Sequence, residues 1–156
     1  MSIRFVALET ELVKSLQTGG LDANGQTPEH YVCAGGMMPC RHCLEDIKEG
    51  EPYLVLAHRP FPTAQPYAEQ GPIFVHANPC VRHAESASVP RTFLTRQAYL
   101  IRGYSAHDRI VYGTGRIVAP TLLAETAHDT FRDPRVSYIH VRSATNNCYQ
   151  CRIDPA

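Results

Sequence analysis

The feature of this sequence that most constrains its fold is a pair of cysteines, Cys40 and Cys43, separated by two residues. A turn of this kind points both sulfur atoms at one place and forms half of a tetrahedral zinc site. A histidine and a third cysteine, His76 and Cys80, follow later in the chain. The order of the four residues predicts that together they bind one zinc ion. Because four protein ligands leave no position for water, we expect the metal to be structural.

The residues around His76 and Cys80 indicate how the second half of the site forms. A short strand, residues 73–75, is predicted to end at His76. Asn78 and Pro79 are typical of the N-cap and first position of a helix, which would place Cys80 in the first turn. The positive end of the helix dipole would then lower the pKa of this thiol. The pattern predicts a treble-clef-like metal knuckle, and the alternative is that the same side chains are packed without a metal.

Cys148 and Cys151 form a second Cys-x-x-Cys motif near the end of the sequence. Three interpretations stay open for it. The pair could replace His76 and Cys80 as metal ligands and complete a four-thiolate zinc ribbon. It could be a redox pair, although a thioredoxin-like pair leads into a helix and few residues follow Cys151. Both thiols could also be packed side chains, which is our interpretation of Cys33, a cysteine without a partner in the sequence.

Hydrophobic patterning predicts both strands and helices along the chain. Strands are expected where apolar and polar residues alternate or short apolar runs occur, at residues 3–8, 53–58, 73–75, 97–104, 109–118 and 136–142. Helices are expected after typical start signals, at residues 11–17 with Thr10 as N-cap and from Pro120 to about Arg132. Gly113 and Gly115 indicate either a bulge within the strand that contains them or a close approach of another backbone.

Two long segments between these elements are predicted to be loops. Residues 18–38 are rich in glycine, and residues 59–72 are rich in proline. The pattern as a whole shows no repeat and no shift in composition. We therefore expect a single α+β domain, residues 1–156, with a mostly antiparallel sheet, two or three helices and the treble-clef-like Cys/His metal knuckle.

Composition argues against several functional classes. The 44 % apolar fraction is that of an ordinary globular protein. With 15 basic and 15 acidic residues the net charge is zero, which argues against a broad nucleic-acid-binding surface. No apolar run is long enough for a membrane span, and Glu9 comes too early for a signal peptide. We therefore expect a cytoplasmic protein whose six cysteines are ligands, catalytic thiols or packed thiols and not disulfides.

A small anionic ligand is compatible with the sequence. Arginine, histidine and tyrosine residues recur on neighbouring predicted strands and could line a shallow pocket for a carboxylate or phosphate. The alternative is that they are solvated residues of a sheet face. The residues concerned are Arg102, Tyr104, Arg109, Arg116, Tyr138, His140 and Arg142. No phosphate-binding loop, zinc-protease motif or nucleophile elbow is present, so no catalytic residue is predicted.

Several stretches form a distinctive set, namely Pro39–Leu44, Gly50–Tyr53, Arg59–Phe61, Gly71–His76, Arg102–Tyr104, Arg109–Gly115 and Asn146–Arg152. In these stretches, which span nearly the whole chain, the sequence resembles the Domain of Unknown Function 1203 family. The resemblance implies a small, single-domain bacterial protein and brings no catalytic residue, because the family has no established activity. It also implies that the Cys40/Cys43, His76/Cys80 and Cys148/Cys151 stretches belong to the family pattern, whereas Cys33 does not.

The leading functional hypothesis is therefore a small bacterial zinc-binding protein with a structural metal and a binding or regulatory role. The alternative is an enzyme. It would be either a thiol redox protein that uses Cys148 and Cys151, or a metal-dependent enzyme in which water displaces one of the four ligands. The sequence identifies neither the substrate nor the macromolecular partner.

Overall fold

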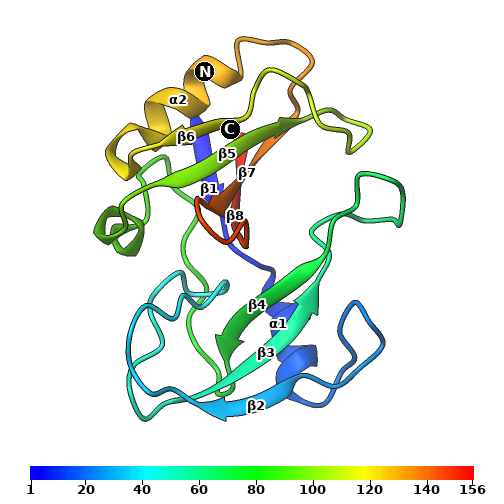
Figure 1. The fold of residues 1–156 in the computed structure, drawn as a ribbon, viewed down its shortest axis with the longest axis vertical. Helices are drawn as coiled ribbons and strands as arrows, with labels where there is room; N and C mark the ends of the chain where they lie inside the picture. The colour runs from blue at the N-terminus through cyan, green and yellow to red at the C-terminus, as the bar shows by residue number, and fades with distance from the viewer. The chain divides into compact units, whose positions relative to one another are not determined.

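The computed structural model describes residues 1–156, which divide into two compact units (Figure 1). Unit 1 comprises residues 1–6, 65–67 and 84–156, and unit 2 comprises residues 7–64 and 68–83. The α+β class is confirmed, with two α-helices and sheets whose strands pair antiparallel. That residues 1–156 behave as one domain stays a prediction.

Unit 1 is built on a five-stranded antiparallel sheet with the order β1-β8-β7-β5-β6. Its elements are β1 (Ile3–Val6), the 3₁₀ helix η1 (Arg91–Thr95), β5 (Tyr99–Tyr104), β6 (Arg116–Val118), the 3₁₀ helix η2 (Pro120–Leu122), α2 (Leu123–Thr130), β7 (Tyr138–Ser143) and β8 (Tyr149–Pro155). Ile101, Ile139 and Ile153 lie on its central strands and are fully buried. Helix α2 lies beside β1 and contributes Leu123 and Ala127, which are also fully buried.

Several boundaries in unit 1 differ from prediction. The predicted strand 109–118 is wrong over most of its length, because only Arg116–Val118 pair with β5. The preceding residues turn instead, with positive φ angles at Asp108 and Gly113. The predicted helix from Pro120 begins as the 3₁₀ turn η2 and becomes α-helical only at Leu123. Strand β8, which the sequence pattern did not predict, pairs with both β1 and β7.

Unit 2 is smaller and contains more irregular structure. Its elements are α1 (Thr10–Gln17), β2 (Glu29–Val32), β3 (Pro52–His58) and β4 (Gly71–His76), and the sheet order is β2-β3-β4. Leu54 and Val75 are register partners, as are Leu56 and Ile73, and all four side chains are buried. This hairpin therefore provides the apolar core against which the Cys-containing loop can be fixed.

Three predictions for the N-terminal part of the chain are corrected. The predicted strand 3–8 ends at Val6, and the predicted loop 18–38 contains β2, an edge strand whose four residues are all exposed. Thr10 is the first residue of α1 and not its N-cap, which is Glu9. The hydroxyl of Thr10 lies instead 3.0 Å from Nε2 of His42.

The helix predicted after Asn78 is absent, so Cys80 does not lie in a helical first turn. Competing contacts explain the difference. The side-chain amide of Gln17 donates to the carbonyl of Asn78 at 2.9 Å, and the backbone N–H of His83 donates to the carbonyl of His42 at 2.9 Å. Val81, the one large apolar residue here, is 87 % exposed, so a helix would bury no apolar face. The helix-dipole argument for a low pKa at Cys80 therefore does not apply.

None of the helices combines the length and the apolar character that a membrane-crossing segment needs.

We predict that Gly103→Ala destabilises the protein by about 1–2 kcal/mol, because a Cβ at Gly103 would overpack its surroundings. This Cβ would lie 3.0 Å from Cγ2 of Val136 and 3.1 Å from Oγ1 of Thr114. Thr114 cannot easily move, since its hydroxyl accepts from the Gly103 N–H and donates to the Val111 carbonyl. Denaturant unfolding measures the difference. The control is Gly115→Ala, where the new Cβ meets nothing within 4 Å, and equal stability of the two variants would contradict the prediction.

Candidate metal centre

Cys40 and Cys43 lie in a tight turn that is fixed to the edge strand β4. The Cys40 N–H donates to the Glu45 carbonyl at 3.0 Å, and the Leu44 N–H donates to the Cys40 carbonyl at 2.9 Å. Leu44 adopts a φ of 57°, which allows the chain to close this turn. Cys40 also pairs with Phe74 of β4 in an isolated parallel bridge. The two sulfur atoms are therefore positioned by backbone hydrogen bonds.

The other two predicted ligands meet this turn. His76 is the last residue of β4, and its Nδ1 lies 3.6 Å from the Cys43 sulfur. The Cys80 sulfur lies 3.9 Å from the Cys40 sulfur, and the four ligand atoms all lie within 4.8 Å of one another. Metal–ligand bonds of about 2.0–2.3 Å in a tetrahedron require ligand–ligand separations of roughly 3.5–3.8 Å. The cluster is therefore positioned to hold one metal ion.

Electrostatics of the metal-free cluster favour a cation at its centre. Neighbouring thiols, first Cys43 and then Cys80, hold the pKa of Cys40 far below its usual value. Cys40 and then Cys43 in turn raise the pKa of Cys80 strongly. Interactions with Cys40 first, and then Cys43, raise the pKa of His76 to about 10. Without a metal, the negative charge of the Cys40 thiolate is thus compensated by the protonated imidazole of His76. Three thiolates can coexist in the cluster only beside a cation.

Glu51 orients the imidazole of His76. Its Oε2 lies 3.2 Å from Nε2 of His76, so a neutral ring would keep its proton on Nε2 and present Nδ1 to a metal. The same oxygen accepts the backbone N–H of Lys48 at 2.8 Å. This backbone N–H is the main group that lowers the pKa of Glu51, and His76 adds to the effect. The carboxylate of Glu51 therefore holds one side of the His76 imidazole, and the other side of the ring faces the position where a metal would bind.

His42 is a residue of the site that the sequence analysis missed. Its Nδ1 lies 3.0 Å from the Cys80 sulfur, its Nε2 lies 3.0 Å from the hydroxyl of Thr10, and only 2 % of the residue is exposed. Burial lowers the pKa of His42, which favours the neutral ring. The neutral ring can then donate from Nδ1 to the sulfur and accept from Thr10. Its place between Cys40 and Cys43 in the sequence was the available signal.

The remaining cysteines are not members of this cluster. Cys148 and Cys151 belong to unit 1, where Cys151 lies in β8 and is fully buried, and neither forms a disulfide. Cys33 belongs to unit 2 but is 2 % exposed, and its thiol donates to the Ile47 carbonyl at 3.4 Å, as expected for a packed side chain. Cys40 and Cys43 meet His76 and Cys80 instead.

A family model described as "Protein of unknown function (DUF1203)" matches residues 37–154. The chain belongs to the DUF1203 family. The match contains the four cluster residues and Cys148 and Cys151, and it leaves out Cys33. No curated protein and no solved structure matches the chain. Membership in DUF1203 therefore brings no activity and no catalytic residue.

Four residues of the predicted Arg/His/Tyr group of this DUF1203 member, namely Tyr104, Tyr138, His140 and Arg142, are buried on the sheet of unit 1, whereas Arg102 is half-buried and Arg109 and Arg116 are exposed. The rings of Tyr104, Tyr138 and His140 pack with centroids 4.6 to 5.3 Å apart. His140 is 1 % exposed and Arg142 is 4 % exposed, so the alternative of solvated side chains is wrong for these two. The Arg102 Nε donates to the Tyr104 hydroxyl at 2.9 Å. An anionic ligand for this group stays a prediction.

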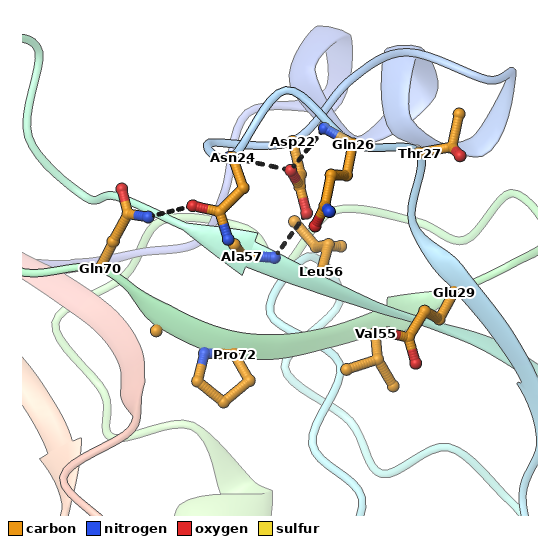
Figure 2. Close-up of a pocket in the computed structure, with 11 residues that line it drawn as sticks. Asp22, Asn24, Gln26, Thr27, Glu29, Val55, Leu56, Ala57, Gln70 and Pro72 are labelled. Carbon is orange, nitrogen blue, oxygen red and sulfur yellow. Dashed lines mark hydrogen bonds between the residues drawn. The ribbon is translucent and has the colours of Figure 1, made fainter.

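A separate polar pocket of about 280 Å³ lies in unit 2 (Figure 2). Asp22 fixes its outer loop, because its carboxylate accepts backbone N–H groups from that loop and from Ala57 of β3. Glu29 adds a carboxylate, and three side-chain amides line the pocket, those of Asn24, Gln26 and Gln70. No basic side chain lines it, so this pocket does not suit the predicted anionic ligand.

We predict that Glu51→Gln weakens metal binding by about tenfold or more, because second-shell partners of a ligating histidine typically contribute that much. Competition with a chelator of known affinity measures the change. The matched control is Glu49→Gln, which neutralises an acidic residue two positions before Glu51 that makes no hydrogen bond to His76. Equal metal affinities of the two variants would show that Glu51 does not support the ligand.

Proposed function

We propose that this DUF1203 protein binds one zinc ion through Cys40, Cys43, His76 and Cys80 and that the metal is structural. The observation that carries the proposal is the convergence of three sulfur atoms and one imidazole nitrogen within 4.8 Å. Zinc suits this donor set because it accepts thiolate and imidazole ligands in tetrahedral geometry and has no redox chemistry of its own.

The position of the ligands in unit 2 supports a structural role. They come from three places, namely the turn at Cys40 and Cys43, the end of β4, and the irregular segment that contains Cys80. A metal would cross-link these segments in a unit whose regular structure is one short helix and three strands. Metal binding to such a site contributes directly to the free energy of folding.

A binding or regulatory role is supported by the distribution of charge. Unit 1 contains ten arginines and six acidic residues, a formal charge of +4, whereas unit 2 contains five basic and nine acidic residues, a formal charge of −4. The net charge of zero therefore hides two oppositely charged units. We assign a small anionic ligand to unit 1 on this basis, since arginine recognises carboxylate and phosphate groups. The six cysteines, none of which forms a disulfide, support a location in the bacterial cytoplasm.

Protein purified without chelator should contain about one zinc per chain, as measured by elemental analysis. Replacement of zinc by cobalt should give the absorption spectrum of a tetrahedral site with thiolate ligands, because the ligand set would impose this geometry. Absence of metal together with disulfides among Cys40, Cys43 and Cys80 would contradict the proposal.

We further predict that Cys40→Ser abolishes stoichiometric zinc binding and lowers the melting temperature, because the cross-link contributes to folding. Circular dichroism and elemental analysis measure the two effects. Cys148→Ser is the control, since Cys148 is a free, half-buried thiol outside the cluster. A Cys40→Ser variant with normal zinc content and normal stability would contradict a structural metal at this site.

A further inference from the structure

The four residues of the metal cluster are not held equally. Cys40 and Cys43 lie in a turn closed by backbone hydrogen bonds, and His76 lies in β4. Cys80 follows Pro79 in a segment without helix or strand, and the backbone groups of Cys80 and Val81 make no hydrogen bond. Segments with few backbone hydrogen bonds and much exposed surface open with the least free energy. Cys80 is therefore the ligand that can leave the cluster most easily.

Solvent exposure distinguishes Cys80 from Cys40. Cys40 is fully buried, whereas Cys80 is half-buried and is followed by Val81, which is 87 % exposed. A dissolved oxidant can therefore approach the Cys80 sulfur more readily than the Cys40 sulfur. Cys43 is also half-buried, but its turn is held in place by the backbone hydrogen bonds on Cys40 and Leu44.

The second thiol needed for a disulfide is close to Cys80. The Cys80 and Cys40 sulfur atoms lie 3.9 Å apart, and Nδ1 of His42 contacts the Cys80 sulfur at 3.0 Å. This contact keeps the sulfur directed into the cluster although its backbone is not fixed. A movement of about 2 Å would bring the two sulfurs to the S–S bond length of about 2.0 Å.

We propose that Cys80 is the oxidation site of the cluster, where a peroxide converts Cys80 and Cys40 into a disulfide and the metal is released. The proposal rests on the zinc site proposed above. In this proposal oxidation is the regulatory signal, and the response is a less stable unit 2, because loss of a structural metal removes part of its folding free energy.

The reaction balances with a peroxide as oxidant. The Cys80 thiolate attacks one peroxide oxygen, the O–O bond breaks, and Cys80 becomes a sulfenic acid while the other oxygen leaves as water after protonation. The Cys40 thiolate then attacks the Cys80 sulfur, forms the S–S bond and displaces hydroxide, which leaves as a second water. Two thiolates lose two electrons in total, and the peroxide gains them. The cluster has then lost two of its four ligands.

The test uses the full chain with Cys148→Ser, which removes a half-exposed thiol outside the cluster. Zinc content is measured first, and hydrogen peroxide is then added in increments while a chromogenic chelator reports released zinc. Remaining thiols are alkylated after each addition, and disulfides are located by peptide mass spectrometry. We expect one zinc released for each Cys40–Cys80 disulfide formed, with Cys43 still alkylated once the protein is denatured. A thiol reductant with added zinc should reverse both changes.

One further measurement, the order of alkylation, keeps the outcome decisive. At one equivalent of iodoacetamide the zinc-loaded protein should be alkylated at Cys80 before Cys43, and Cys33 should stay unmodified because it is buried. A disulfide that joins Cys43 to either partner, or zinc release with Cys80 unmodified, would overturn the proposal while leaving the zinc site intact. Absence of zinc before oxidation would overturn the zinc site itself and its release together. The initial zinc content therefore distinguishes the two failures.

Discussion

Three sulfur atoms and an imidazole nitrogen within 4.8 Å form the constraint on which unit 2 depends. Thiols brought this close cannot all ionise without a compensating cation, and the opposite pKa shifts of Cys40 and Cys80 express that conflict. A metal resolves it by pairing each thiolate with positive charge. A bound metal would then hold the turn at Cys40, the end of β4 and the irregular segment at Cys80 together.

The cluster could be predicted from sequence because it depends on residue type and order. Cys40 and Cys43 define a local turn, and β4, although it begins at Gly71, ends at His76, where the pattern predicts. Cys80 was correctly included, but for a wrong reason, since the helix expected there is absent. Contacts from Gln17 and His42 to this segment come from distant parts of the chain, and no local pattern contains them.

Other elements were missed for related reasons. Strand β2 is an exposed edge strand that exists through pairing with β3, so its own residues carry no alternating pattern. Strand β8 pairs on both sides, and Cys151 within it belongs to a Cys-x-x-Cys motif that indicates ligands or a redox pair instead of a strand. The net charge of the whole sequence is likewise zero because the formal charges of the two units are opposite and cancel. The sequence thus predicted which side chains converge better than it predicted the elements that position them.

Helix α1 is tied to the metal centre at both of its ends. Thr10 at its start contacts His42, and Gln17 at its end donates to the carbonyls of His76 and Asn78. An isolated helix of eight residues is not stable in water, so α1 depends on such attachments. A metal that entered or left the cluster would therefore act on a helix of unit 2 through these contacts. A partner that binds α1 would sense metal occupancy without touching the metal.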